Sequence, residues 1–500
     1  MATTHTHETL IVGAGFSGLG AAIKLGKAGL NKAGDIVILE RSDRVGGTWR
    51  DTSYPGASCD IPSLLYSYSF VKNPTWSRTY SPADEIRQHL EDMATRFDIR
   101  RHIRFGQEVT GLSFDEDDGV WTATTATRKR FRARTVVLAS GPLPDSSFPD
   151  IRGIDSYGGH KIHSARWDHD YDFTGKRVAV IGTGASAIQI IPELVKQAEF
   201  VKVFQRTPGW VLPRWDVATP PAVQKVFAKA PAVQQLARQA LYWGHEASAT
   251  ALVWNTPLTS VVTRLGRLHL HRQVKDPWLR RQLTPDFTPG CKRMLVSSDY
   301  YPALQRDNCK LIDWPIATLS PVGIRTSDGI EHHVDCIVFA TGYDVHLTGP
   351  PFPVTGLGGR KLSAEWANGA QAYKSASAHG YPNLFLMTGP NSGPGHNSLL
   401  VFIEGQLDYA VRGITTILDN DLRYLDVRDD VQRRYNKRIQ QRLTKTTWMS
   451  GCNSWYLTKD GFNASMYPGF ATQYLRQMRD FQFADYDAVE RAAVRVSTSA

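Results

Sequence analysis

Two copies of one glycine-rich motif constrain this 500-residue chain more than any other feature. The first copy reads Gly13-Ala14-Gly15-Phe16-Ser17-Gly18 and the second reads Gly182-Thr183-Gly184-Ala185-Ser186-Ala187, each directly after a short apolar run. In a dinucleotide-binding unit the first glycine allows a tight turn, and the second lets the backbone approach a pyrophosphate. The third position lets helix and strand pack closely. One such motif is weak evidence, but two in one chain predict that two dinucleotides are held at once.

The surroundings of the first motif match a complete dinucleotide-binding unit. Residues 9–12 are a short apolar run, residues 19–28 have a helical pattern, and residues 35–40 are typical of a second strand. Glu40 ends that strand, 22 residues after Gly18, where a carboxylate can accept hydrogen bonds from adenosine ribose hydroxyls. An incidental glycine turn is the alternative, and the strand, the helix and the acid together disfavour it.

A second Gly-Gly turn follows the expected adenosine site. It lies in the run Gly46-Gly47-Thr48-Trp49, which is a reasonable place for the rest of an FAD molecule. Asp60 belongs to the next loop, where it is either a solvated carboxylate or a part of the site.

The second motif has a different residue after its second strand. The strand at 201–204 ends in Gln205-Arg206-Thr207, where the first unit has Glu40. A site for NAD needs a carboxylate here, whereas a site for NADP needs a cation for the 2′-phosphate. Arg206 therefore predicts NADPH over NADH, and an ordinary surface charge is the alternative. Ala187 replaces the third glycine, which is an accepted variant.

The fold class that follows is α/β, with two Rossmann-like dinucleotide-binding domains, one for FAD and one for NADP, and a helical insertion. We place the FAD-binding domain at 1–145 and 384–500, and the NADP-binding domain at 146–218 and 286–383. Residues 219–285 are rich in Ala, Leu, Gln, Arg and Trp at helical spacing, which predicts the insertion. We expect Trp243 and Trp254 within it to be packing residues rather than ligand contacts.

Composition and cysteine usage exclude several classes of protein. Lys and Arg total 58 against 48 Asp and Glu, and this net charge of +10 suits anionic ligands without the dense basic block of a nucleic-acid-binding protein. The five cysteines are far apart and form no CxxC pair, so neither a metal site nor a redox dithiol is indicated. We expect reduced thiols in a cytoplasmic protein, without a signal peptide or stable membrane insertion, as a monomer or weak homo-oligomer.

A flavin and a nicotinamide in one chain mean that hydride passes from NADPH to FAD. Disulfide reductases pass the electrons on to a cysteine pair, and no CxxC pair is present here. Molecular oxygen or an external acceptor remains. A run shortly before the second glycine motif, from Tyr157 to Asp168, indicates which of these two acceptors is used.

This run resembles the diagnostic motif of the class B flavoprotein monooxygenases, and within them of the Baeyer–Villiger monooxygenases. That motif is Phe-x-Gly-x-x-x-His-x-x-x-Trp followed by Pro or Asp; this chain has Tyr157, Gly159, His163, Trp167 and Asp168. The one departure exchanges Phe for Tyr. Related N- and S-oxygenating enzymes usually have Tyr at the Trp167 position, so Trp167 favours the Baeyer–Villiger branch. Judged without the family, His163 is more often a packed or surface histidine.

The resemblance, which covers about residues 10–469, also implies roles. Arg293 is similar to the arginine that stabilises an anionic C4a-peroxyflavin and the following tetrahedral adduct, and Asp60 to its carboxylate partner. His163 is implied to couple cofactor movement to catalysis. Lys292 resembles the lysine that joins Arg206 on the 2′-phosphate, and Trp455 resembles the tryptophan of a loop that closes over NADP.

The implied reaction consumes NADPH and O₂ and inserts one oxygen atom next to a ketone carbonyl, giving an ester or lactone; sulfides are possible side substrates. The alternatives are a flavin N- or S-oxygenase on the same scaffold and a non-catalytic nucleotide sensor. The residues that we assign to the cofactors are Gly13, Gly15, Ser17, Gly18, Glu40, Gly47, Thr48, Trp49, Asp60, Tyr66, Val109, Gly182, Thr183, Gly184, Ala185, Ser186, Gln189, Arg206, Thr207, Lys292 and Trp455.

Overall fold

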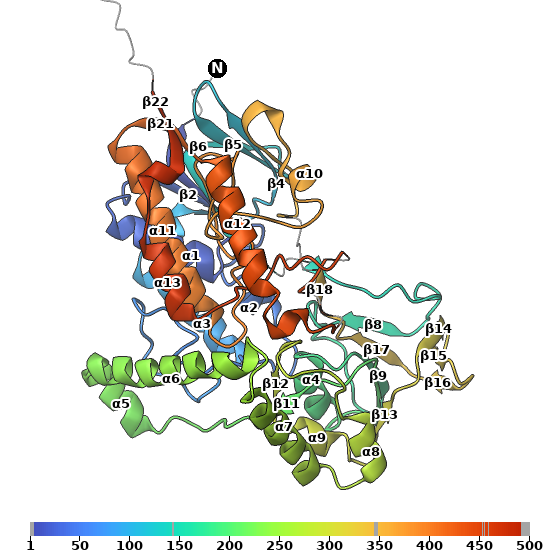
Figure 1. Cartoon of the computed structure of the whole chain (residues 1–500). Helices are drawn as coiled ribbons and strands as arrows, with labels where there is room; N and C mark the ends of the chain where they lie inside the picture. The colour runs from blue at the N-terminus through green and yellow to red at the C-terminus, as the bar shows by residue number, and fades with distance from the viewer. Residues whose placement is uncertain are drawn as a thin grey trace, which may run out of the picture.

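The computed structural model describes residues 5–142, 145–344, 349–452, 454, 456–458 and 460–491. Two sheets with parallel cores organise these residues (Figure 1), and helices cover them. The first sheet has the order β19-β4-β5-β6-β1-β2-β3, with β20 also paired to β6. Its strands are β1 (Thr6–Val12), β2 (Ile36–Leu39), β3 (Ile103–Arg104), β4 (Val109–Asp115), β5 (Val120–Thr125), β6 (Arg130–Leu138), β19 (Val354–Thr355) and β20 (Leu384–Leu386).

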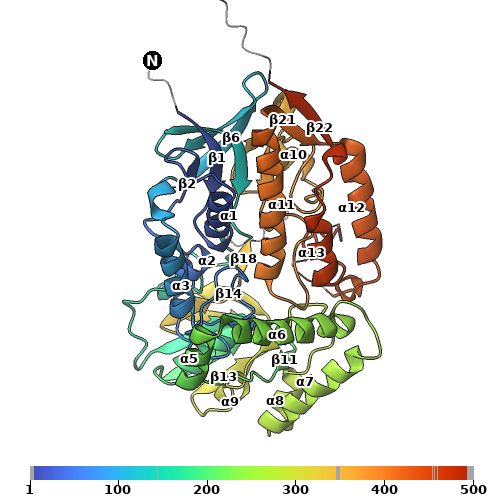
Figure 2. The ribbon, with the colours of Figure 1, turned by 90° about the vertical axis from the view of Figure 1, so that its left-hand side faces the viewer.

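The first sheet is parallel where it carries the glycine motif. β1 pairs in parallel with both β2 and β6, and all four residues of β2 are buried. Such uninterrupted apolar runs are typical of parallel strands that are covered on both faces. The covering helices include α1 (Phe16–Lys27), α3 (Ala83–Arg96), α11 (Leu399–Asp419) and α13 (Ala471–Arg479), with α12 (Asp429–Leu443) beside them (Figure 2).

The second sheet is parallel throughout and has the order β13-β10-β9-β17-β8. Its strands are β8 (His160–His163), β9 (Arg177–Ile181), β10 (Phe200–Phe204), β13 (Cys309–Ile312) and β17 (Cys336–Phe339), and α4 (Ala187–Leu194) follows β9. A small antiparallel sheet of β14 (Ile316–Ser320), β15 (Gly323–Thr326) and β16 (Glu331–His333) extends this unit. These features confirm the expected α/β class with two Rossmann-like units.

Two short strands carry the chain from one sheet to the other. β7 (Asp145–Ser146) follows β6 of the first sheet, and β18 (Tyr343–Asp344) follows β17 of the second. The two strands pair antiparallel, with Tyr343 opposite Ser146. The outgoing and returning chain therefore form one two-stranded connector between the sheets.

The expected helical insertion is present as α5 (Pro221–Lys229), α6 (Pro231–Leu252), α7 (Thr259–Gln273) and α8 (Pro277–Gln282). It leaves after β11 (Val211–Leu212) and returns at β12 (Leu295–Val296), and these two strands pair in parallel. α6 lies across the front of the molecule in Figure 2, with α5 and α7 packed against it.

The expectation for the two insertion tryptophans is confirmed for one and wrong for the other. Trp254 is half-buried, and its ring lies 5.0 Å from that of Phe470. Trp243 has 56% of its surface exposed. Helical spacing shows which residues share a face but not which face meets the core, so the sequence could not separate the two cases.

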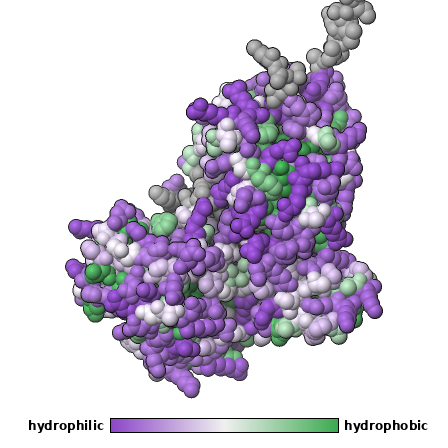
Figure 3. Space-filling model, turned by 180° about the vertical axis from the view of Figure 1, so that it is seen from behind, coloured by the Kyte–Doolittle hydropathy of each residue, from purple (hydrophilic) through white to green (hydrophobic). Residues whose placement is uncertain are grey.

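The surface seen from behind is mostly hydrophilic, with scattered apolar side chains (Figure 3). Among the described residues, no helix is both long and apolar enough to cross a membrane.

Candidate functional site

The first glycine motif has the close contacts that require its glycines. Gly13 has a φ of +102°, and a Cβ atom there would lie 2.6 Å from the carbonyl oxygen of Ala139. A Cβ atom on Gly18 would lie 1.9 Å from the carbonyl oxygen of Gly13. Only glycine therefore permits this turn between β1 and α1 and the close packing of the helix on it.

The two glycine turns of the first unit lie against each other. A Cβ atom on Gly47, whose φ is +54°, would lie 3.1 Å from the Cα atom of Gly15, and Gly46 donates its N–H to the carbonyl of Ala14 over 3.1 Å. Bare backbone from both turns thus forms one cradle at the start of α1, which is suited to a diphosphate. Thr48 and Trp49 begin α2 (Thr48–Asp51) beside it.

Glu40 is buried at the end of the adjacent strand. Its carboxylate accepts hydrogen bonds from the N–H of Ala14 (2.8 Å), the N–H of Ser42 (3.0 Å) and the guanidinium of Arg50 (2.9 Å). A carboxylate has about four acceptor positions, so it keeps capacity for a ribose hydroxyl. Sequence reasoning missed Arg50, because a cation ten residues further along the chain gives no signal that it folds back onto the strand end.

The second glycine motif repeats this geometry. Gly182 has a φ of +115°, and a Cβ atom there would lie 2.5 Å from the carbonyl oxygen of Ala340, just as Gly13 meets Ala139. A Cβ atom on Gly184 would meet no atom within 4 Å, so the backbone is open to a ligand there. Ala187 is fully buried, which explains why a small residue serves at the third position. Ala185 and Ser186 lead into α4.

Arg206 and Lys292 come together next to this motif, although 86 positions separate them. The pKa of Lys292 is lowered, first by burial and then by the nearby positive charge of Arg206. The ammonium group of Lys292 lies 4.8 Å from the centre of the Phe287 ring. Thr207 accepts a hydrogen bond from the Thr183 hydroxyl over 3.2 Å, which fixes the strand end to the glycine turn. Two cations held together despite repulsion favour an anionic ligand between them.

An ion pair between Arg293 and Asp60 joins the two units. The Nε of Arg293 donates to one carboxylate oxygen of Asp60 over 2.9 Å, and its Nη2 donates to the other over 2.7 Å. Asp60 raises the pKa of Arg293 further above its ordinary value, and the arginine side chain is still 54% exposed. Arg293 is therefore a permanently charged cation that Asp60 holds in place and that remains open to a ligand.

Aromatic side chains surround this pair. Burial raises the pKa of Tyr66, the nearby charge of Arg293 counteracts this rise, and the Tyr66 hydroxyl accepts a hydrogen bond from the indole of Trp49 over 3.0 Å. Tyr456 is buried nearby; burial raises its pKa to about 12, and Arg293 counteracts this rise. Sequence reasoning missed Tyr456, although it follows Trp455 directly. Trp455 itself lies outside the described residues.

Gln189 on α4 bridges the two units. Its side-chain oxygen accepts from the hydroxyl of Tyr54 over 2.9 Å, and its side-chain nitrogen donates to the carbonyl of Ser58 over 3.0 Å. Two other expected cofactor residues are buried: Ser17 in α1 and Val109 at the start of β4.

His163 lies at the connector between the sheets. Its Nδ1 accepts the N–H of Ala165 over 3.1 Å, so in the neutral ring Nε2 carries the proton and donates to the carbonyl of Ser147 over 3.3 Å. The hydroxyl of Thr341 lies 3.4 Å from the same nitrogen. Ser147 follows β7 and Thr341 precedes β18, so one side chain contacts both crossing segments.

The other motif residues around His163 have packing roles. A Cβ atom on Gly159 would lie 2.2 Å from the hydroxyl of Tyr157, which in turn donates to the carbonyl of Val334 over 3.0 Å. The departure from Phe to Tyr is thus accommodated by a hydrogen bond. Trp167 stacks on Phe173, and Asp168 lies 2.9 Å from the ring nitrogen of His160. The motif thus builds the strand that positions His163.

The expectation of reduced thiols throughout is wrong for two of the five cysteines. Cys291 and Cys452 form a disulfide with a Cα–Cα distance of 6.3 Å across a sequence separation of 161 residues. Cys59, Cys309 and Cys336 are free and buried. Spacing alone could not indicate this pair, because only the tertiary fold brings the loop before Lys292 next to the loop after Met449.

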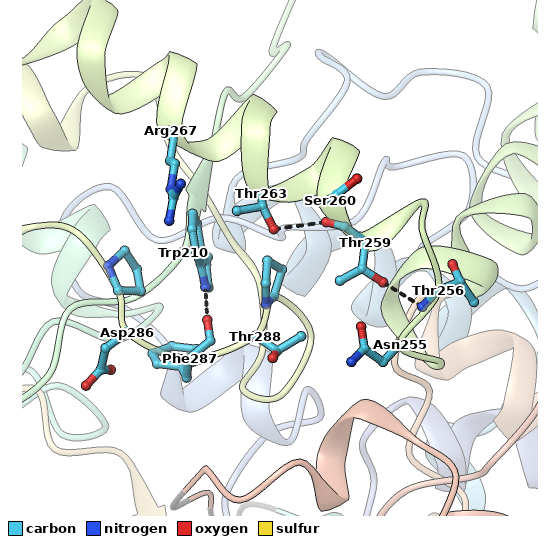
Figure 4. A pocket seen from close by; sticks show the side chains of 12 residues that line it. Trp210, Asn255, Thr256, Thr259, Ser260, Thr263, Arg267, Asp286, Phe287 and Thr288 are labelled. Carbon is cyan, nitrogen blue, oxygen red and sulfur yellow. Dashed lines mark hydrogen bonds between the residues drawn. The ribbon is translucent and has the colours of Figure 1, made fainter.

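A pocket of about 420 Å³ lies beside α7 (Figure 4), and its lining comes from residues 210–289. Trp210 donates its indole N–H to the carbonyl of Phe287 over 2.7 Å, and Thr263 donates to the carbonyl of Thr259 over 3.0 Å. The pocket thus borders the loop that supports Lys292, on the insertion side.

Together these features define a flavoprotein that binds two dinucleotides. They are the two glycine cradles, the cations Arg206 and Lys292 beside the second cradle, and the ion pair of Arg293 and Asp60 between the units. Residues 10–232 match the family described as pyridine nucleotide-disulphide oxidoreductase. The chain is 41% identical over 502 aligned residues to a Baeyer–Villiger monooxygenase of Streptomyces coelicolor, covering 99% of this chain and 95% of that protein. It is 39% identical to a Baeyer–Villiger monooxygenase of Pseudomonas aeruginosa, covering 99% of this chain and 93% of that protein.

Solved structures agree with these relatives. A closed cyclohexanone monooxygenase superposes with a TM-score of 0.87 at 27% identity, covering 98% of this chain and all of that one. An oxidised steroid monooxygenase bound to NADP superposes with a TM-score of 0.85 at 30% identity, covering 97% and 100%. The chain belongs to the Baeyer–Villiger monooxygenases, as its motif predicted.

The disulfide predicts a defined thiol count. We expect three titratable thiols in unfolded, unreduced protein and five after reduction, because Cys291 and Cys452 are paired. Replacing Cys452 by Ser should lower the free energy of unfolding by about 2–5 kcal/mol, since the lost cross-link closes a long loop. Five thiols without reductant would contradict the pairing, and Cys309→Ser serves as the control without a cross-link.

His163 predicts a contribution to the pH dependence of stability. Burial lowers the pKa of His163 below its ordinary value of about 6.5. Below about pH 6.5 the unfolded chain therefore binds a proton at this histidine more readily than the folded chain does. The contribution is present above about pH 6.5 and is lost as the pH falls. In His163→Asn the fall in melting temperature between about pH 7.5 and about pH 5.5 should be smaller than in the wild type. Thr341→Val, which removes a neighbour that does not titrate, should keep the wild-type fall; equal falls in all three would contradict the assignment.

Proposed function

We propose that this protein binds FAD at the first glycine cradle and NADPH at the second, and inserts one oxygen atom of O₂ next to a ketone carbonyl to give an ester or lactone. The observation that carries the proposal is the bidentate pair of Arg293 and Asp60 between the two cradles. The membership in the Baeyer–Villiger monooxygenases supports the reaction class.

The residues of the first unit fit FAD. The bare backbone of Gly13, Gly15 and Gly47 suits the pyrophosphate, and Glu40 is positioned for the ribose. When bound, FAD supplies the chemistry that accepts a hydride from NADPH and activates O₂. Trp49, Tyr66 and Asp60 are on the segments that continue from the cradle toward Arg293, where we propose that the isoalloxazine ring lies.

The residues of the second unit fit NADPH rather than NADH. The open backbone at Gly184 suits the pyrophosphate, and the cations of Arg206 and Lys292 suit the 2′-phosphate. We propose that 146–218 and 286–383 form this NADP domain, and that 1–145 and 384–500 form the FAD domain.

Arg293 provides the charge that the reaction needs. Attack on a ketone carbonyl places negative charge on the carbonyl oxygen, and a preorganised cation stabilises that charge more than it stabilises the neutral ketone. Asp60 holds the guanidinium in one orientation through two hydrogen bonds and leaves its remaining N–H groups for the substrate.

His163 acts away from the reacting atoms. Its contacts with Ser147 and Thr341 tie the second sheet to the residues that flank both strands of the connector. We assign it a positioning role in the movement of one nucleotide-binding unit relative to the other during the cycle.

Arg293→Ala should lose at least about 100-fold in ester formation while NADPH is still oxidised, because only the stabilisation of developing charge is removed. Ester or lactone is measured by gas chromatography, and NADPH oxidation by absorbance, with a panel of linear and cyclic ketones. Arg293→Lys keeps the charge without the bidentate geometry, so its rate of ester formation should lie between those of the wild type and Arg293→Ala. Ester formation by Arg293→Ala at the wild-type rate would overturn the role, and a wild type that oxygenates only amines or sulfides would overturn the reaction.

Lys292→Ala and Arg206→Ala should each lower kcat/KM for NADPH by about 10- to 100-fold, because each removes a charged partner of the 2′-phosphate. The values for NADH should change little, since NADH has no such group. Lys310→Ala on the neighbouring strand β13 is the matched control. Equal losses with both coenzymes would contradict the assignment.

A further inference from the structure

Helix α6 of the insertion buries three polar side chains beside Ala249 and Ala251, while large apolar side chains lie on its solvent-facing side. Gln234, Arg238 and Glu246 are buried, with at most 8% of their surfaces exposed. Val233, Leu236 and Trp243 lie on the opposite side of the helix at spacings of three and seven residues, and are 43%, 69% and 56% exposed. A surface helix of a globular protein normally has the reverse arrangement.

Polar contacts hold α6 in this orientation. Arg238 donates to the carbonyl of Leu64 over 2.6 Å and lies 3.3 Å from the carboxylate of Glu404. Glu246 accepts from His396 over 3.2 Å and from the N–H of Thr472 over 2.8 Å. Rotating the helix to bury its apolar side would leave these charges without partners, which is costly, so the apolar side stays outward.

The neighbouring helices extend the same kind of surface. Four apolar residues at helical spacing are at least 45% exposed along α7. They are Leu258, just before the helix, and Val261, Leu265 and Leu268 within it. Val223 and Val226 on α5 are 36% and 48% exposed. We name the exposed apolar side chains of these three helices the insertion face; they are Val223, Val226, Val233, Leu236, Trp243, Leu258, Val261, Leu265 and Leu268.

The insertion also carries most of the net positive charge of the protein. Residues 219–285 contain nine Lys and Arg against the acids Glu246 and Asp276, a formal charge of +7 out of +10 for the whole chain. Two of these charged side chains, Arg238 and Glu246, are buried, and the others include Arg264, Arg267 and Arg272 on the exposed part of α7.

The three insertion helices expose both apolar and cationic side chains, and this combination points to one kind of partner. Exposed large apolar side chains that gather on neighbouring helices are typical of an interaction site. A second copy of the chain would bring two strongly positive surfaces together, and a nucleic acid would make no use of the Leu and Val side chains. An anionic lipid bilayer satisfies both features, because its headgroups attract Lys and Arg while its interface accepts Trp, Leu and Val.

We propose that the insertion face docks this protein on the surface of membranes that contain anionic phospholipid. The binding is peripheral: the helices lie in the interface with their apolar sides toward the acyl chains. The proposal is independent of the reaction, because it rests on the exposed faces of α5, α6 and α7 alone.

The test is sedimentation of the full-length protein with vesicles of phosphatidylcholine that contain about one third phosphatidylglycerol. We expect the wild type to sediment with these vesicles at low salt, at least about tenfold more than with pure phosphatidylcholine. High salt should weaken the binding, because it screens the charge contribution. Leu236→Glu combined with Trp243→Glu should reduce the bound fraction at least about tenfold.

A matched double variant controls for charge and exposure. Trp314→Glu combined with Ile330→Glu changes two apolar residues outside the insertion that are 56% and 54% exposed, and it should bind vesicles like the wild type. Melting temperatures identify any variant that fails to fold. No preference of the wild type for anionic vesicles, or equal losses in both double variants, would overturn the proposal. A dimer in sedimentation velocity that only the α6 variant dissociates would also overturn it, because the face would then be a self-interface.

Discussion

The bidentate pair between Arg293 and Asp60 is the interaction on which the geometry of the site depends. Asp60 comes from the loop after the Gly46-Gly47 turn, and Arg293 comes from the segment that returns from the insertion. The pair therefore fixes two parts of the chain that belong to different nucleotide-binding units. A guanidinium held by two hydrogen bonds keeps one orientation, and its other N–H groups remain available to a ligand. A lone surface arginine has no such fixed orientation.

Several contacts support the loop that carries this arginine. Gly290 has a φ of +91° and packs against the carbonyl of Leu252 at the end of α6, the next residue Cys291 is bonded to Cys452, and Ser450 donates to Cys291 over 3.3 Å. The insertion and the loop before Tyr456 thus share in positioning Arg293. The insertion is in this way linked both to the site and, through its outer face, to the proposed membrane surface.

In its proposed positioning role, His163 explains how a motif can be diagnostic without contacting the reacting atoms. Tyr157, Gly159 and Trp167 pack within the second unit, and their effect is to place one histidine against the residues that flank both strands of the connector. A connector of only two short strands concentrates relative movement of the units in a few residues. A residue that contacts the segments next to both strands is therefore well placed to influence that movement.

The sequence by itself determined the local chemistry: both glycine turns, the parallel strands before them, the contrast between Glu40 and Arg206, and the family motif. These are short-range patterns, in which neighbouring residues must satisfy one local geometry. Only the tertiary structure decided the pairing of Cys291 with Cys452, the return of Arg50 to Glu40, the burial of Tyr456 beside Arg293 and the outward direction of Trp243. The reason is that long-range contacts depend on how the elements pack, and the orientation of a helix such as α6 is set by its partners rather than by its own periodicity.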